Sequence, residues 1–242
     1  MNKIIFWDFQ GTLAHNDWMF SKALYKVLIK NGTSTDISVE DFKKKPMKGF
    51  PWQDHEKEYI HLTDSSVWWK NAEQIFIECY QSLGLMEEIA LKFAQQVREE
   101  LIKIDDFILY EDTIETLNYF KERGFMNVIL SNHIPELPQI VEGLGLSPYL
   151  LDCISSANVG YEKPNPKIYQ YALEKYKYSK ELWMVGDSIF ADVRGAENVG
   201  IKGVLVRNKK EDNIEYYSSN LMGLKEIIKS IVEKHKFTIY KF

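Results

Sequence analysis

From residue 114 onward, this 242-residue chain alternates helical patterns with short apolar runs, and that rhythm limits the folds open to it. Strands are expected at an initial run and at four later ones: residues 4–8, 127–131, 152–155, 182–186 and 203–206. Helical periodicity marks residues 114–123, 134–144, 166–176 and 192–199, each of which precedes one of the four later runs. Residues 237–242 also alternate in polarity and could add an edge strand. Strands joined through helices form a parallel sheet with helices on both faces, so the predicted fold class is α/β.

Residues 15–103 do not follow this rhythm, because they contain helical patterns and no convincing strand. The helical patterns lie at residues 18–30, 38–44, 68–83 and 87–102. An insertion of this kind after the first strand indicates a separate cap domain. We therefore predict an all-helical cap at residues 15–103 and a core formed by residues 1–14 and 104–242. The two crossings between them are expected near residues 13–16 and 105–110.

The charge balance and the cysteine content exclude several classes of protein. A net charge of −5 argues against a general nucleic-acid binder, which needs a basic surface. Lys43, Lys44 and Lys45 form the only compact basic run, and we expect it to be solvated. Cys79 and Cys153 are too few for a disulfide framework and are expected to be buried thiols. Since no segment reaches the roughly 18 apolar residues of a membrane helix, we expect a cytoplasmic protein with neither nucleic-acid nor membrane partners.

Polar side chains follow the predicted strands at their carboxyl ends. Asp8 ends the first strand, and Ser131 and Asn132 end the second. Asp187 follows the fourth strand, and Lys163 lies in the loop after the third. Because ligands of parallel α/β sheets bind beyond the carboxyl ends of the strands, these residues predict one site.

This set of side chains is typical of phosphoryl transfer through a covalent intermediate. A carboxylate such as Asp8 can attack phosphorus and form an aspartyl phosphate. Asp8 and Asp187 offer the hard oxygen ligands that Mg²⁺ prefers. Lys163 adds a positive charge, and the hydroxyl of Ser131 can donate to phosphate oxygens. We therefore expect Mg²⁺ as the cofactor and a small phosphorylated or otherwise activated metabolite as the substrate.

Four segments resemble the motifs of the haloacid dehalogenase (HAD) superfamily, and they occur in the order of that family. Asp8-Phe9-Gln10-Gly11-Thr12 is similar to the first motif, Asp-x-Asp-Gly-Thr, and Ile129-Leu130-Ser131-Asn132 is similar to the second. Glu162-Lys163-Pro164 resembles the third motif, and Gly186-Asp187-Ser188 with the later Asp192 resembles the fourth. The resemblance implies a phosphatase-like hydrolase with a Rossmann-like sheet of strand order 5-4-1-2-3 and a helical cap.

Carried over to this sequence, the resemblance implies a metal site. Asp8 would be the nucleophile and also a Mg²⁺ ligand, and Asp187 would be a further ligand. The backbone carbonyl of Gln10 would bind the metal as well, since that contact does not depend on the side chain. Asp192 would join or support the metal site.

The resemblance also implies residues that bind the phosphate or the substrate. Thr12 and Ser131 would position the phosphate, and Asn132 lies next to Ser131 at the same strand end. Lys163 would balance the negative charge on Asp8 and on the phosphate.

Gln10 departs from the family pattern, because the residue at this position of the first motif is the Asp that acts as general acid/base. An amide cannot exchange a proton near neutral pH, and general acid–base help is worth about 10²–10⁴-fold in rate. We therefore expect weak activity on poor leaving groups and better activity on acyl phosphates, aryl phosphates and phosphoanhydrides. Two alternatives stay open: a catalytically inactive phospho-ligand-binding homologue, and a haloacid dehalogenase- or phosphonatase-like enzyme that cleaves C–halogen or C–P bonds.

Two further features have both a structural and a functional interpretation. His15 follows the first motif and His133 follows the second, so either side chain could face the site or be structural. Trp18, Trp52, Trp68 and Trp69 crowd the predicted cap, where they form either its core or an apolar substrate pocket.

Overall fold

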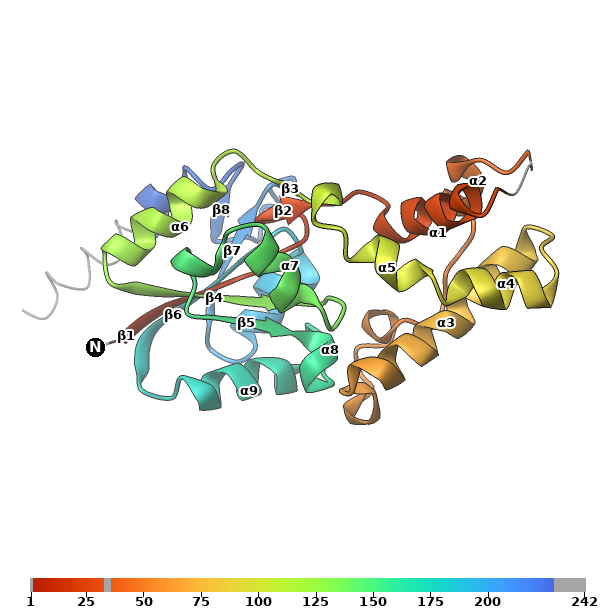
Figure 1. Ribbon diagram of the computed structural model, residues 1–242. Helices are drawn as coiled ribbons and strands as arrows, with labels where there is room; N and C mark the ends of the chain where they lie inside the picture. Colours follow the sequence, from red (N-terminus) through yellow and green to blue (C-terminus); the bar gives the residue numbers. More distant parts are fainter. Residues whose placement is uncertain (1, 33–35, 229–242) are drawn as a thin grey trace, which may run out of the picture.

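The computed structural model describes residues 2–32 and 36–228, and its central feature is a parallel sheet joined to a helical segment (Figure 1). Within these residues the sheet has six strands in the order β5-β4-β1-β6-β7-β8, and all neighbouring strands are parallel. The strands are β1 (Asn2–Trp7), β4 (Phe125–Ser131), β5 (Asp152–Ser155), β6 (Ser179–Gly186), β7 (Lys202–Val206) and β8 (Tyr216–Ser218). The α/β prediction is confirmed. The five predicted strands lie in the order 5-4-1-2-3, and β8, which was not predicted, extends the sheet beyond β7.

Helices cover both faces of this sheet, with α6 and α7 on one side and α9 on the other (Figure 1). The elements around the sheet are α6 (Thr113–Glu122), α7 (Leu137–Gly143), α8 (Ser156–Val159), α9 (Pro166–Lys175), α10 (Gly195–Glu197), a π-helical turn (Ile189–Arg194) and a 3₁₀ turn (Ser147–Tyr149). Side chains of β1 alternate between the two faces, as expected for an extended strand. Ile5 and Trp7 are buried on the side of α6 and α7, whereas Ile4 and Phe6 are buried on the side of α9. A strand buried on both faces explains the continuous apolar run at the start of the chain.

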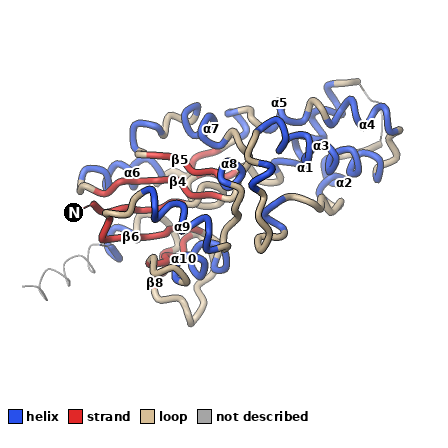
Figure 2. Tube along the Cα trace, turned by 90° about the horizontal axis from the view of Figure 1, so that it is seen from below, coloured by secondary structure: helices blue, strands red, loops and turns tan. Residues whose placement is uncertain are grey.

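The chain between β2 (Ala14–His15) and β3 (Ile108–Leu109) is helical and lies beyond the carboxyl ends of the sheet strands (Figures 1 and 2). Its elements are α1 (Met19–Lys30), α2 (Val39–Lys43), α3 (Ser65–Ser82), α4 (Glu87–Ala94), α5 (Val97–Leu101) and 3₁₀ turns at Pro51–Gln53, Ile60–Leu62 and Ile104–Asp106. β2 and β3 pair in antiparallel fashion, so the two predicted crossings lie side by side. The division into a cap at residues 15–103 and a core at residues 1–14 and 104–242 stays a prediction.

Several helices begin or end away from their predicted limits for local reasons. α7 begins at Leu137 because Pro135 and Pro138 disfavour an earlier helical turn. α3 begins at Ser65 because the Asp64 carboxylate accepts hydrogen bonds from the backbone N–H groups of Ser66 and Val67. The helix expected at residues 192–199 is a π-helical turn followed by α10. The edge strand proposed for residues 237–242 lies outside the described residues. No helix in the described part of the chain combines the length and the apolar character needed to cross a membrane.

Candidate active site

Asp8 stands where β1 ends, between the carboxyl ends of its parallel neighbours β4 and β6. Its backbone N–H still donates to the carbonyl of Val185 at 2.9 Å, which holds the residue in line with the sheet. The Ser131 hydroxyl, from the end of β4, donates to Asp8 Oδ1 at 2.8 Å. Lys163 Nζ donates to the same oxygen at 2.7 Å. The structure thus brings three of the predicted site residues into direct contact around one carboxylate.

Lys163 is almost completely buried and is held from two directions. Its ammonium group contacts Asp8 Oδ1 at 2.7 Å and Asp192 Oδ1 at 2.5 Å. Burial lowers the pKa of Lys163, but the carboxylates of Asp192 and Asp8 more than offset this effect, so its pKa lies above the ordinary value. The side-chain amide of Asn132 accepts from the Lys163 N–H at 2.7 Å and donates to the Lys163 carbonyl at 2.9 Å. Asn132 therefore fixes the backbone that presents this cation.

Three carboxylates converge beside Lys163. One oxygen from each of Asp8, Asp187 and Asp192 lies within 4.8 Å of the other two. Burial, followed by the negative charges of Asp8 and Asp192, raises the pKa of Asp187 to about 7. Because three carboxylates face one ammonium group, the cluster has surplus negative charge, and its donors are the hard oxygens that suit Mg²⁺. The residues present fit a divalent cation.

Two glycines allow these carboxylates to approach the backbone. Gly11 has a φ of +85°, and a Cβ at this position would meet Asp187 Oδ2 at 2.5 Å. A Cβ on Gly186 would collide with the carboxylate of Asp192. Asp192 can therefore fold back against the strand end, where its Oδ2 accepts from the Ser188 N–H at 3.0 Å. The glycines of the first and fourth motifs are required by this packing.

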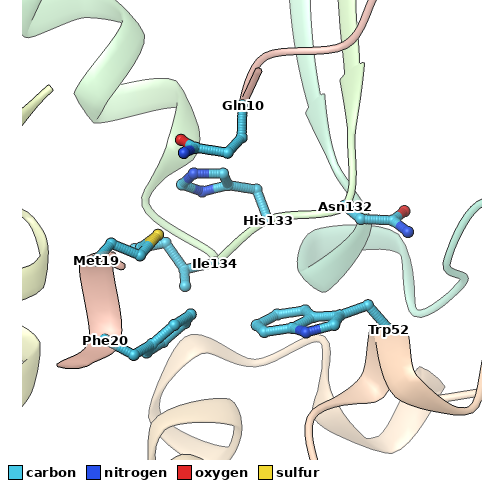
Figure 3. A pocket seen from close by; sticks show the side chains of 7 residues that line it. All are labelled: Gln10, Met19, Phe20, Trp52, Asn132, His133 and Ile134. Carbon is cyan, nitrogen blue, oxygen red and sulfur yellow. The ribbon is translucent and has the colours of Figure 1, made fainter. Parts of the chain in front are cut away.

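Thr12 and Gln10, also in the first motif, each have a polar side-chain atom without a hydrogen-bond partner among the described residues. Thr12 is fully buried, and its hydroxyl meets no partner among the described residues. Gln10 Oε1 is buried, and within residues 2–32 and 36–228 it also lacks a partner. Gln10 lines a cavity together with Asn132 and His133, although the carboxamide of Asn132 points away from the other lining side chains (Figure 3).

The two histidines that follow the first and second motifs lie in different places. His133 lines the cavity beside Gln10, whereas His15 packs on Tyr110 at the two crossings.

His133 is buried and lies between aromatic rings. Its imidazole packs edge-on against Phe9, with ring centres 5.5 Å apart, and near Phe107 at 6.2 Å. Burial lowers the pKa of His133 to about 4, so the ring is neutral at physiological pH. Neither ring nitrogen has a hydrogen-bond partner in the described part of the chain.

Glu136 links the sheet side of the molecule to the helical segment, a contact that the sequence pattern did not predict. Its buried carboxylate accepts from Ser65 Oγ at 3.0 Å, from Trp69 Nε1 at 2.9 Å and from Arg98 Nη2 at 2.6 Å. These partners come from α3 and α5. A single acidic residue in a loop carries no signal of such a role, because its partners lie far away in the sequence.

Glu162, next to Lys163, gives a stability prediction. Burial raises the pKa of Glu162 from 4.5 to about 7, and its Oε2 lacks a partner among the residues described. Between pH 4.5 and about pH 7, the folded protein keeps a proton on Glu162 that the unfolded chain has lost. The free energy of unfolding therefore falls as the pH rises through this range. Replacing Glu162 with Gln is expected to raise the free energy of unfolding by up to about 3 kcal/mol above pH 7, and by little near pH 4.

Guanidinium unfolding of wild type and Glu162→Gln, near pH 4 and above pH 7, measures this difference in the free energy of unfolding. Glu174→Gln is the control, because Glu174 is exposed on α9. If the substitution raises the free energy of unfolding equally at both pH values, the Glu162 carboxyl is not held protonated in the folded protein.

A family model described as haloacid dehalogenase-like hydrolase matches residues 2–200. The chain is 26% identical over 220 residues to a glyceraldehyde 3-phosphate phosphatase of Methanopyrus kandleri, covering 89% of this chain and 88% of that protein. It is 30% identical over 136 residues to a phosphoserine phosphatase of Thermus thermophilus, covering 55% of this chain and about half, 53%, of that relative.

Solved structures show the same fold. A HAD phosphatase from Thermococcus onnurineus is similar with a TM-score of 0.62 and 25% identity, over 93% of this chain and 97% of that one. The HAD-hydrolase YfnB of Bacillus subtilis, described as bound to magnesium, has a TM-score of 0.70 at 16% identity, over 94% and 99% of the two chains. Because the family model spans most of the sequence, the protein belongs to the haloacid dehalogenase-like hydrolase family and is a hydrolase.

Proposed function

We propose that this protein is a Mg²⁺-dependent phosphohydrolase that acts on a small phosphorylated metabolite through an aspartyl phosphate at Asp8. The observation that carries the proposal is the arrangement around this carboxylate. Ser131 and Lys163 both contact Oδ1 of Asp8, and Asp187 and Asp192 complete an acidic cluster beside it. The phosphatase names of the relatives in Methanopyrus and Thermus support phosphate as the group that is transferred. A cytoplasmic location stays a prediction from the sequence.

The chemistry follows from how Asp8 is held. Because Oδ1 is occupied by Ser131 and Lys163, Oδ2 is the atom that attacks phosphorus. The new Asp8–phosphorus bond forms while the bond from phosphorus to the leaving oxygen breaks, and the leaving oxygen takes the electron pair. Water then attacks the phosphorus, releases inorganic phosphate and restores the carboxylate. Lys163 and Ser131 stabilise the charge on the phosphoryl oxygens throughout.

The cation would be held by residues that already converge. Asp8, Asp187 and the backbone carbonyl of Gln10 would bind Mg²⁺, and Asp192 would support them by orienting Lys163 and the Ser188 loop. When bound, the ion would supply positive charge beside the transferring phosphoryl group. Thr12 would place its unpartnered hydroxyl toward the phosphate. Asn132 would act chiefly by fixing Lys163.

The test of the proposal is phosphorylation of Asp8. Incubation with acetyl phosphate and Mg²⁺ is expected to add one phosphoryl group, detected by intact mass and located on Asp8 by peptide mapping after borohydride trapping. Absence of the adduct together with absence of turnover would contradict the proposal. Gln10 favours one competing function, a binder of phosphorylated ligands that does not turn them over. Tight calorimetric binding of a phosphorylated ligand without hydrolysis would support that alternative.

Gln10→Asp tests the leaving-group argument. The new carboxyl group can protonate a basic alkoxide, so the rate on a sugar phosphate is expected to rise at least about 10-fold more than the rate on acetyl phosphate, whose leaving group needs little protonation. Gln10→Asn is the matched control, because it changes the length of the side chain but keeps the amide. Equal gains of Gln10→Asp on both substrates would remove the argument.

A further inference from the structure

A cavity of about 190 Å³ opens beside Gln10, and aromatic and aliphatic side chains form most of its wall (Figure 3). Its lining comprises Gln10, Met19, Phe20, Trp52, Asn132, His133 and Ile134. The rings of Phe20 and Trp52 lie 5.8 Å apart at an angle of 34°, and both come from the helical segment. The opposite wall belongs to the loop that follows Ser131, the residue whose hydroxyl contacts Asp8. Gln10 and this loop therefore place the cavity next to the residues that surround the nucleophile.

Polar atoms in this apolar wall lack partners. Gln10 Oε1 is buried, His133 is 4% exposed, and neither Gln10 Oε1 nor either ring nitrogen of His133 finds a hydrogen bond in the described chain. Burying such groups without partners costs free energy, and a neutral imidazole offers one donor and one acceptor. Together with the acceptor on Gln10, these atoms are arranged to meet a hydroxyl or an N–H group on a ligand.

The cavity has room for one aromatic ring. An apolar cavity of about 150 Å³ holds one benzene molecule, so the space beside Gln10 suits a single six-membered ring with a small substituent. Aromatic rings favour offset or edge contacts with one another, which Phe20 and Trp52 can provide.

We propose that the substrate is an aryl phosphate whose single ring lies against Trp52 and Phe20 and carries a hydroxyl or N–H group that contacts Gln10 and His133. This inference rests on the proposed function and narrows it to one substrate class. It agrees with the loss of the acid at position 10, because an aryl oxide is a weak base and leaves without protonation. Cleavage of the phosphorus–oxygen bond would release an aryl oxide into the cavity, and this anion would take a proton from water to become a phenol.

The first experiment separates the effect of the aromatic ring on the rate from the effect of the acidity of the leaving group. Initial rates are compared for phenyl phosphate and for a fluorinated alkyl phosphate whose alcohol is as acidic as phenol. Wild type is expected to favour phenyl phosphate by at least about 10-fold in kcat/KM. Trp52→Leu and Phe20→Leu are expected to remove most of this preference by lowering kcat/KM on phenyl phosphate, and the quantity compared is the ratio of the two kcat/KM values within each variant. Tyr178→Leu, at an exposed tyrosine, is the control and should keep the wild-type ratio.

The second experiment addresses the polar atoms. Among the three hydroxyphenyl phosphates, at least one is expected to be hydrolysed with a lower KM than phenyl phosphate, and His133→Leu should abolish that difference. If no hydroxyl position lowers KM, the assigned contact with Gln10 and His133 is wrong.

The outcomes separate this inference from the proposed function. Equal rates on phenyl and fluoroalkyl phosphate in wild type would overturn the aryl assignment while Asp8-dependent hydrolysis stands. If acetyl phosphate and all esters fail as substrates, the proposed function fails, and calorimetry with phenylphosphonate then tests the cavity directly. Binding of phenylphosphonate that both Trp52→Leu and Phe20→Leu leave unchanged would overturn the inference. Circular dichroism confirms that each variant is folded before it is compared.

Discussion

Replacing Asp8 with Asn is expected to lower turnover of every phosphorylated substrate by at least about 10⁴-fold, because the amide lacks the charged oxygen that attacks phosphorus. The substitution is isosteric, and the amide oxygen can still accept from the Ser131 hydroxyl and from Lys163 Nζ, which contact Asp8 Oδ1 at 2.8 Å and 2.7 Å. A loss of rate would therefore report the missing nucleophile and not a displaced side chain. Steady-state rates on acetyl phosphate measure turnover, and intact-mass detection of the phosphoryl adduct measures phosphorylation of Asp8.

The control for this prediction is Asp212→Asn, which makes the same chemical change at an exposed position. It should keep the wild-type rate and still form the adduct. If Asp8→Asn retains more than a tenth of the wild-type rate, Asp8 is not the nucleophile.

Replacing Lys163 with Met is expected to be the most destabilising single change at the site. It leaves the buried carboxylates of Asp8 and Asp192 facing each other without the ammonium group that lies within 2.7 Å of both. Removing one partner of a buried ion pair typically costs about 3–5 kcal/mol, because the remaining charge has neither water nor a counterion. The midpoint of guanidinium unfolding measures the loss, which we expect to become smaller when Mg²⁺ is added.

Two companion variants sharpen this test. Lys175→Met removes a half-exposed lysine paired with Asp152, and a surface pair of this kind is worth about 1 kcal/mol or less. Asp192→Asn combined with Lys163→Met removes one of the two uncompensated charges and should recover part of the stability. If Lys163→Met costs no more than Lys175→Met, the carboxylates at the site are not charged in the folded protein.

Much of the sheet and of the cluster at its edge could be predicted from local patterns. Apolar runs give the strands, and parallel strands bring their carboxyl ends to one edge whatever separates them in the chain. Asp8, Ser131 and Asp187 meet for this reason, and the segment after β5 and the turn after β6 add Lys163 and Asp192.

The features that were missed depend on side chains that meet across the molecule. Asn132 holds the backbone of Lys163, a pairing that the local sequence does not show. The sequence predicts Trp52 for the cap core or an apolar pocket but does not point to Phe20, and only tertiary packing places both around one cavity. β8 is short, which leaves too few residues for a clear alternation of polarity.

The contact made by Glu136 has a kinetic consequence for the cavity. Phe20 and Trp52 belong to the helical segment, whereas Asn132, His133 and Ile134 belong to the sheet side, so the enclosure exists only while the two sides stay together. The carboxylate that binds Ser65, Trp69 and Arg98 holds them together from outside the cavity. Release of a product from the cavity would then require Glu136 to separate from these three partners, together with other contacts across the same boundary, such as the hydrogen bond from the Tyr59 N–H to the Gly160 carbonyl.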